Sequence, residues 1–198
     1  MSKKEPLILF IHGLASSGRY KMADMLRIQL KPCTVLAPDI PVDPGAALSM
    51  LKRICSEYRP DLVVGLSLGG FWAQKLRGMR KALVNPDFYP SALLRTRIGE
   101  MKFLYPREDG AESFVIDEDL CRGYEILEKD CFEGVDAEEQ GLTAGFFASD
   151  DEMVRHGNIF SLHYPLGTKV DYPGTHLPSY PVMKKFISPE LEKFLKYQ

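Results

Sequence analysis

A serine stands at the centre of the segment Gly65-Leu66-Ser67-Leu68-Gly69, which has the pattern G-x-S-x-G. The segment follows the apolar run 62–64 and precedes the helix-like segment 70–76. A serine on a sharp turn between a strand and a helix exposes its Oγ atom, and the N-terminus of the helix offers backbone N–H groups. The pattern therefore predicts a nucleophile that attacks an acyl carbon. The alternative interpretation is a tight turn whose glycines only allow close packing of helix and strand.

A serine hydroxyl needs a histidine to take its proton and a carboxylate to orient that histidine. In folds with this turn, the three groups follow one another along the chain as serine, acid and histidine, each after a strand. Of the four histidines, only His176 follows the last expected strand, in a loop where Gly174 leaves the backbone free to aim the ring at Ser67. We predict that His176 is the general base, and we expect a structural role for His12, which precedes the serine.

Three consecutive carboxylates, residues 150–152, follow an expected strand and are candidates for the acid. Any one of them can instead cap a helix or complement its dipole. We favour Asp151, because the spacing D-x-x-V leaves Val154 to anchor the loop while the aspartate faces the histidine. Asp150 is the second choice, and Asp87, which follows another expected strand, is the third.

Acyl transfer also requires donors for the negatively charged oxygen of the intermediate, and loss of one such donor costs about 2.7–4 kcal/mol. The backbone N–H of Leu68, directly after the nucleophile, is one candidate, and that of Leu14, in the loop after the first strand, is the other. Gly13 allows the substrate to approach closely. Trp72 and Phe88 are candidates for the substrate pocket, although aromatic residues near strand ends more often belong to the core.

Short aliphatic runs alternate with amphipathic segments, which is typical of βαβ units and a parallel sheet. The expected strands are 7–11, 34–37, 62–64, 82–85, 142–148 and 168–172. The expected helices are 20–30, one that begins at residue 44, 70–76 and 189–197. The rhythm is lost between residues 86 and 141, where one helix is expected around 120–131. We predict one α/β domain, residues 1–198, with a mostly parallel doubly wound sheet, helices on both faces and a small cap insertion at about 87–140.

Composition narrows the classes of partner. The 198 residues carry a net charge of −2, from 25 basic and 27 acidic side chains, which argues against binding nucleic acid or an anionic membrane. The apolar run 7–11 is shorter than the apolar region of about 7–15 residues in a signal peptide, and no run approaches the roughly 20 residues of a membrane span. We expect a soluble, cytoplasmic protein that acts on a small molecule; its oligomeric state stays open.

The four cysteines, at positions 33, 55, 121 and 131, form no C-x-x-C pair and have no histidine at zinc spacing. They are typical of reduced thiols, so we expect neither disulfides nor a metal. The loop 12–18 lacks the G-x-G-x-x-G pattern of dinucleotide-binding domains.

Several segments taken together, 10–17, 37–41, 65–73, 85–86, 151–152 and 174–176, resemble the YqiA/YcfP-type small esterases of the α/β-hydrolase superfamily. The resemblance runs nearly from end to end. It implies a compact α/β-hydrolase fold with little lid, a triad of Ser67, Asp151 and His176, and esterase or acyl-thioesterase activity without a cofactor. The chain departs from the family pattern at Asp150, a second acid, and at Asp87, where a small apolar residue is usual.

The resulting hypothesis is two-step acyl transfer, in which an ester or thioester forms an acyl-enzyme on Ser67 that water then hydrolyses. The alternatives are a noncatalytic small-molecule sensor on a hydrolase scaffold, or an acyltransferase or peptidase that uses the same triad. The sequence does not encode which ester is the substrate.

Overall fold

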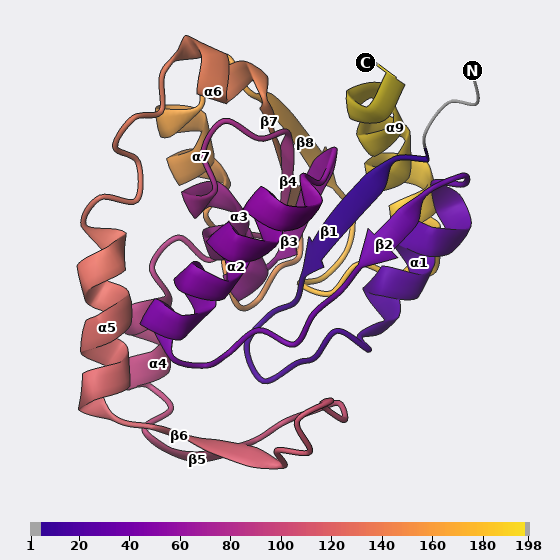
Figure 1. The fold of residues 1–198 in the computed structure, drawn as a ribbon. Coiled ribbons are helices and arrows are strands. Elements are labelled where there is room, and N and C mark those ends of the chain that lie inside the picture. Colours follow the sequence, from indigo (N-terminus) through magenta and orange to yellow (C-terminus); the bar gives the residue numbers. More distant parts are fainter. Residues whose placement is uncertain (1–4, 197–198) are drawn as a thin grey trace.

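A six-stranded parallel sheet forms the centre of the computed structural model, which describes residues 5–196 (Figure 1). Its strands are β1 (Leu7–Ile11), β2 (Thr34–Leu36), β3 (Leu62–Leu66), β4 (Lys81–Val84), β7 (Thr143–Ala148) and β8 (Thr168–Tyr172). They lie in the order β2-β1-β3-β4-β7-β8, and every neighbouring pair is parallel. The strand order changes direction between β1 and β3, because β2 lies on one side of β1 and the later strands lie on the other. In sheets of this kind, ligands bind beyond the carboxyl ends of the strands at such a reversal.

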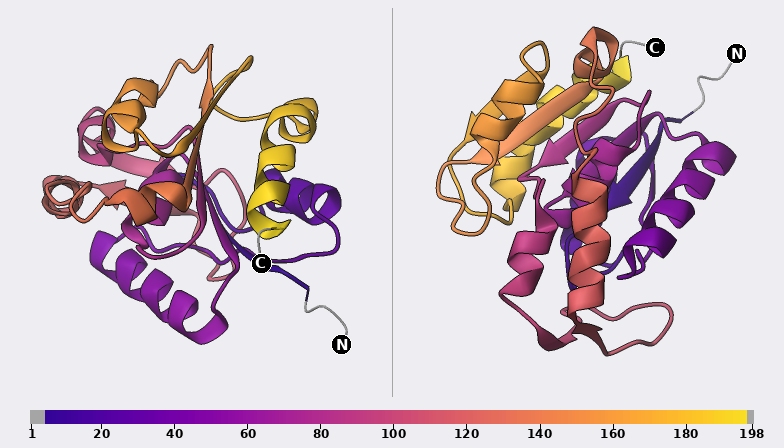
Figure 2. Two further views of the ribbon diagram at one scale, coloured as in Figure 1. Left: turned by 90° about the horizontal axis from the view of Figure 1, so that it is seen from above. Right: turned by 90° about the vertical axis from the view of Figure 1, so that its left-hand side faces the viewer.

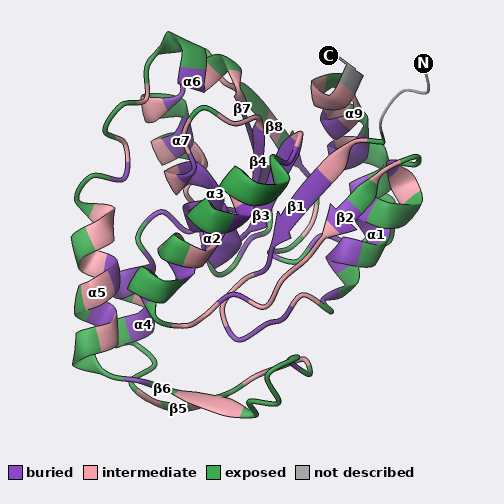
Figure 3. Cartoon of the chain, in the orientation of Figure 1, coloured by how far each residue is buried: buried purple, intermediate pink, exposed green. Residues whose placement is uncertain are grey.

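Helices cover both faces of this sheet (Figure 2). On one face lie α1 (Lys21–Gln29), the π-helical turn η1 (Met183–Ile187) and α9 (Ser188–Lys196). On the other lie α2 (Pro44–Tyr58), α3 (Leu68–Lys75) and α7 (Gly157–His163). Successive residues of a strand point to opposite faces, so Ile8 packs on the first face and Leu9 on the second. The central strands β1, β3, β4 and β7 are therefore buried on both sides (Figure 3), and the predicted doubly wound parallel sheet is confirmed.

The segment 87–140, which we predicted to be a cap insertion, contains more regular structure than the sequence indicates. It consists of α4 (Pro90–Arg95), the antiparallel hairpin β5 (Gly99–Lys102) and β6 (Ser113–Ile116), α5 (Glu118–Glu128) and α6 (Ala137–Gly141). The helix expected around 120–131 is α5, and its Tyr124 is fully buried among core residues. The hairpin stands apart from the main sheet (Figure 1).

The hairpin is attached to the loops that follow β1 and β2. The N–H of Leu104 donates to the carbonyl of Ala15 at 2.7 Å. The N–H of Glu108 donates to the carboxylate of Asp39 at 2.6 Å. The guanidinium of Arg107 is buried and lies 3.2–3.5 Å from the carboxylate of Asp109, in its own loop, and from main-chain oxygens of the two attachment loops. The hairpin is thereby held over the carboxyl end of β1.

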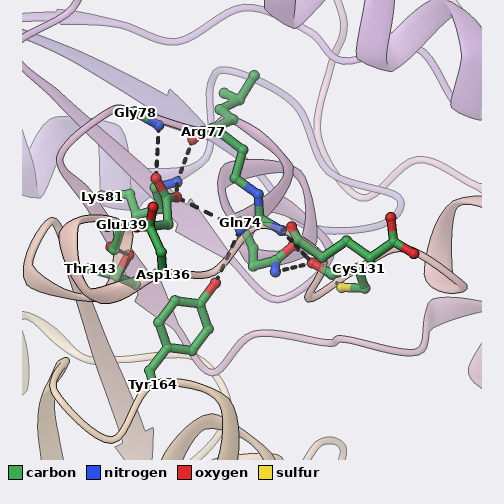
Figure 4. A network of polar contacts seen from close by, with 11 residues as sticks. Gln74, Arg77, Gly78, Lys81, Cys131, Asp136, Glu139, Thr143 and Tyr164 are labelled. Atoms are coloured by element: carbon green, nitrogen blue, oxygen red, sulfur yellow. Dashed lines mark hydrogen bonds and ion pairs between the residues drawn. The ribbon is translucent and has the colours of Figure 1, made fainter.

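A buried polar network joins α6 to the beginning of β4 (Figure 4). The ammonium of Lys81 donates to the carboxylate of Glu139 and to the carbonyl of Leu76, and Glu139 also accepts from the N–H of Gly78 at 2.8 Å. Burial lowers the pKa of Lys81 to about 8, an effect that Glu139 opposes. Because the strands are parallel, this network lies at the N-terminal ends of the strands, whereas Ser67 lies at their C-terminal ends. The network fixes the end of the predicted insertion.

The closing helix α9 begins at Ser188, one residue before the expected start, and Tyr197, its expected end, lies outside the described residues. Within residues 5–196, no helix combines the length and the apolar character that crossing a membrane requires.

Candidate active site

Ser67 forms the corner between β3 and α3. Its backbone has φ 56°, in the left-handed region that non-glycine residues occupy at a cost of about 1–3 kcal/mol. The N–H of Ser67 donates to Val84 O at 3.0 Å, and its carbonyl accepts from the N–H groups of Gly70 at 2.8 Å and Asp87 at 3.1 Å. The surrounding backbone therefore holds the serine in a strained turn, as the G-x-S-x-G pattern predicts.

The two glycines of this turn leave no room for side chains. A Cβ atom on Gly65 would lie 2.1 Å from the carbonyl oxygen of Gly69, and one on Gly69 would lie 2.0 Å from that of Ile11. Backbone thus touches backbone at both positions, and the close contact with β1 brings the loop after that strand next to Ser67.

The side chains of His176 and Asp151 form a buried hydrogen bond. Nδ1 of His176 lies 2.7 Å from Oδ2 of Asp151, and the two residues are 3% and 1% exposed. A carboxylate only accepts, so Nδ1 carries the proton and Nε2 is left as an acceptor. The other oxygen of Asp151 accepts from the N–H groups of Met153 and Val154 at 2.8 and 2.9 Å. Burial alone would raise the pKa of Asp151, but the hydrogen bonds from His176 and the two N–H groups hold it below its usual value.

The other two carboxylates considered from the sequence lie in different surroundings. Asp150 is exposed and its carboxylate accepts from the hydroxyl of Ser149 at 3.1 Å. Asp87 is buried, and its carboxylate lies 3.8 Å from Nδ1 of His156. Burial raises the pKa of Asp87 to about 6. Of the three, Asp151 is the carboxylate that contacts His176.

Ser67 and His176 line the same cavity, which has a volume of about 220 Å³. Gly13 and Leu14, from the loop after β1, form part of its wall, and a Cβ atom built on Gly13 would lie 3.9 Å from Oγ of Ser67. Much of the remaining wall is apolar and comes from Leu66, Leu93, Met101, Leu104, Met153 and Leu177. The predicted nucleophile and base thus face a common space in which an acyl group fits.

The two backbone groups predicted to bind the negative oxygen lie beside this cavity. Leu68 is the first residue of α3, where N–H groups have no partner within the helix. Leu14 and Leu68 line a smaller neighbouring cavity together with Gly13. Both residues therefore lie close to the nucleophile, and the role of their N–H groups as donors stays a prediction.

Neither Trp72 nor Phe88 lines the cavity that contains Ser67, whereas Trp72 lines the smaller neighbouring cavity together with Leu14 and Leu68. Trp72 is 1% exposed, and its ring packs 5.5 Å from that of Tyr124 in α5. Phe88 is fully buried and its ring stacks on His156 at 5.8 Å. Helix α5 covers this part of the core, and α4 and the hairpin supply wall residues of the Ser67 cavity. A role of Trp72 and Phe88 in substrate binding stays a prediction.

Asn85 is a site residue that the sequence reasoning did not single out. Its Nδ2 donates to the carbonyl of His176 at 2.7 Å and to the hydroxyl of Tyr172 at 2.8 Å, while its Oδ1 accepts from the N–H of Ala148 at 2.8 Å. Asn85 therefore ties the ends of β4, β7 and β8 to the loop that carries the imidazole. The available signal was an amide directly after an apolar strand, at a position with φ 43° that Asn tolerates.

His12 is placed as a structural residue. Its Nε2 accepts from the N–H of Ile40 at 2.9 Å and its Nδ1 donates to the carbonyl of Gly13 at 2.8 Å. Burial lowers the pKa of His12 to about 4. A neutral ring therefore fixes the loop that contains Gly13 and Leu14.

The model of the uncharacterised protein family UPF0227 matches residues 7–163. The chain belongs to this family. The match includes Ser67 and Asp151 and ends before His176, and it confirms the resemblance identified from the sequence. No curated protein sequence gives a significant match to the chain.

Solved structures show that this family member has the α/β-hydrolase fold. A monoacylglycerol lipase from Paleococcus ferrophilus superimposes with a TM-score of 0.66 at 13% identity, covering 98% of this chain and 96% of the lipase. Est1E from Butyrivibrio proteoclasticus has a TM-score of 0.68 at 17% identity, covering 98% and 88% of the two chains. A thioesterase domain from the curacin biosynthetic pathway has a TM-score of 0.59 at 16% identity, covering 97% and 92%. At these identities the likeness concerns the fold.

Proposed function

We propose that this protein is a serine hydrolase that cleaves a carboxylic ester or an acyl thioester through an acyl-enzyme on Ser67. The observation that carries the proposal is the hydrogen bond between His176 and Asp151, at the edge of a cavity that Ser67 also lines. A strained serine, an imidazole with a free Nε2 and a buried carboxylate are the parts that nucleophilic acyl transfer needs.

In the first step, Oγ of Ser67 attacks the carbonyl carbon of the substrate while Nε2 of His176 takes the hydroxyl proton. Asp151 holds the imidazole in the tautomer that leaves Nε2 free and stabilises the imidazolium. The carbonyl oxygen becomes negatively charged and is bound by the N–H groups of Leu14 and Leu68. The C–O or C–S bond then breaks, and His176 returns the proton to the leaving alcohol or thiol.

In the second step, His176 takes a proton from water, which attacks the acyl group on Ser67. The resulting intermediate collapses, the proton returns to Oγ, and a carboxylic acid is released. Each step uses only groups of the chain and water. The proposal therefore includes no cofactor, and its partner is a small-molecule ester or thioester.

The neighbouring structures support this reaction class, because they include a lipase, an esterase and a thioesterase. The apolar wall of the cavity suits an acyl group. The net charge of −2 supports a small molecule over a nucleic acid or a membrane as the partner. We also propose that the reaction takes place in the cytoplasm.

Hydrolysis of p-nitrophenyl butyrate tests the proposal. The Ser67→Ala variant should lose at least about a thousandfold in kcat while it keeps the melting temperature of the wild type. Ser49→Ala, which changes an exposed serine of α2, is the matched control and should keep full activity. Equal turnover by Ser67→Ala and wild type would refute the nucleophile, and a wild type that binds esters without hydrolysing them would instead indicate a sensor.

A further inference from the structure

Two cationic side chains line the cavity that contains Ser67. They are Arg97, which follows α4, and Lys102, the last residue of β5. The described residues that line this cavity include no aspartate or glutamate. Lys102 also borders an open cavity of the hairpin loop, which Glu112 shares, but no ion pair joins these two side chains. The wall of the Ser67 cavity therefore carries positive charge, although the chain as a whole has a net charge of −2.

The other basic side chains of the segment 90–107 are paired with carboxylates. The guanidinium of Arg95 lies 2.6 Å from a carboxylate of α5, and that of Arg107 lies 3.2 Å from the carboxylate of its own loop. Within residues 5–196, the side chains of Arg97 and Lys102 form neither a hydrogen bond nor an ion pair. The two basic side chains that line the Ser67 cavity are thus the ones that a bound anion can still pair.

An anionic oxygen group on the substrate would satisfy both cations. A carboxylate accepts two hydrogen bonds from the planar guanidinium of an arginine and a further one from the ammonium of a lysine. Arg97 and Lys102 are exposed, whereas Ser67 is only 9% exposed. The anion would therefore stay hydrated at the rim while the acyl carbonyl reaches the nucleophile inside, so that no charge has to be buried.

The cavity between the charged rim and the nucleophile is short and apolar. Leu93 and Met101 line it and come from the same segment as the two cations. Its volume of about 220 Å³ lies below the roughly 300–1,000 Å³ of sites for drug-sized ligands. A substrate that fits has a short apolar spacer between its reactive carbonyl and its charged group.

We propose that Arg97 and Lys102 form a subsite for a negatively charged oxygen group, of which a carboxylate is the smallest, on the ester or thioester that enters the Ser67 cavity. This inference rests on the proposed function and narrows its substrate class from neutral to anionic compounds. The alternative is that the two cations only cover apolar wall and keep the rim hydrated. In that case a charged substrate has no advantage over a neutral one.

Two pairs of small esters test the subsite, and the members of each pair have nearly the same shape but differ in charge. Monoethyl glutarate carries a carboxylate on its acid part, where ethyl glutaramate carries a neutral amide. O-Butyrylglycolate carries the carboxylate on its alcohol part, where its amide is neutral. The two pairs therefore also show which part of the substrate reaches the subsite. Chromatography of the released ethanol or butyrate gives kcat/KM for each compound.

In dilute buffer, we expect the carboxylate of at least one pair to exceed its amide about three- to tenfold in kcat/KM, because each exposed ion pair is weak. Arg97→Gln and Lys102→Gln should each lower this ratio, and about 0.5 M salt should bring it toward one by screening the charges. The matched controls are Arg53→Gln and Lys52→Gln, which remove the same charge from exposed positions of α2 and should keep the wild-type ratio.

The ratio separates recognition from a merely structural role, because a loosened fold would reduce hydrolysis of both members of a pair together. Ratios near one in both pairs, or a wild-type ratio in Arg97→Gln and Lys102→Gln, would overturn the subsite. Binding of the same four compounds to Ser67→Ala, measured by NMR titration, needs no turnover. If the wild type hydrolyses neither p-nitrophenyl butyrate nor these esters, the proposed function fails. The subsite is then decided by whether the carboxylates bind more tightly than their amides.

Discussion

The side chain of Asn85 donates a hydrogen bond to the main-chain carbonyl of His176, with 2.7 Å between nitrogen and oxygen. A residue at the end of β4 thus fixes the loop that carries the imidazole, although 91 residues separate the two positions. The same amide contacts the ends of β7 and β8, so the position of the imidazole depends on three strands at once.

Replacement of Asn85 by alanine should lower kcat for ester hydrolysis by about 10- to 100-fold, since small displacements of a reacting group have effects of that size. The loss should appear well below the melting temperature, in protein with an unchanged circular dichroism spectrum. Asn158→Ala, at an exposed position in α7, is the matched control. Wild-type kcat in Asn85→Ala would show that the loop of His176 is held by other contacts.

The choice among the acids is tested by comparing Asp151→Asn with Asp150→Asn. An asparagine at 151 would place an N–H₂ group against Nδ1 of His176 and favour the wrong tautomer, so kcat should fall by about 10⁴. Asp150 is exposed and bonds to Ser149, so its variant should stay within about twofold of the wild type. A larger loss at Asp150 than at Asp151 would reverse the assignment.

Asp87 should make the protein less stable as the pH rises through 6. Burial raises the pKa of Asp87 from 3.8 to about 6, with Glu128 and Asp151 acting in the same direction and His176 in the opposite one. A raised pKa in the folded protein gives stability that is complete below the unfolded value and is lost as the pH rises through the folded value.

At pH 8, the free energy of unfolding of Asp87→Asn should therefore exceed that of the wild type by up to about 3 kcal/mol, and this difference should vanish near pH 4. Denaturant unfolding at the two pH values measures it. The amide keeps an oxygen for the N–H of Tyr89. We expect kcat to stay within about threefold of the wild type, because Asp151 is the acid that contacts His176. A stability gain that does not vary between pH 4 and pH 8 would contradict the raised pKa.

The buried ion pair of Lys81 and Glu139 should matter more when it is broken than when it is replaced (Figure 4). Glu139→Gln leaves the Lys81 ammonium without a carboxylate and should cost about 3–5 kcal/mol in the free energy of unfolding. The double variant Lys81→Met with Glu139→Gln removes both charges and keeps an oxygen for the N–H of Gly78, so it should recover much of that loss in urea unfolding. A loss below about 1 kcal/mol in Glu139→Gln would show that the pair contributes little.

The parts of the fold that the sequence predicts are those with a strong local signal. Apolar runs bounded by glycine and proline locate the main strands, and the glycines around Ser67 locate the turn, because a side chain there would collide with backbone. Lys81 shows the limit of such signals. Its charge suggests a surface position and placed the expected strand one residue late, whereas its side chain is fully buried because Glu139, 58 residues away, pairs with it.

At the site, too, the sequence predicts the residues with a local signal and misses those whose surroundings depend on distant segments. The order of serine, acid and histidine along the chain identifies His176 and favours Asp151, because each follows a strand. The pocket cannot be identified in this way, since its wall depends on where α4 and the β5–β6 hairpin lie. Strand β5 gives a weak signal in the sequence, because its four residues include a glycine and only one large apolar residue, Met101. The aromatic character of Trp72 is equally consistent with core and pocket, and its surroundings depend on how α5 packs against it.

The central claim, that Ser67 is an activated nucleophile, is tested most directly by reaction with a fluorophosphonate followed by mass spectrometry of the peptides. We expect a single adduct on the peptide that contains Ser67, none in Ser67→Ala, and much slower labelling in Asp151→Asn. Intact, folded protein that takes up no label, or that carries it on a different residue, would contradict the account.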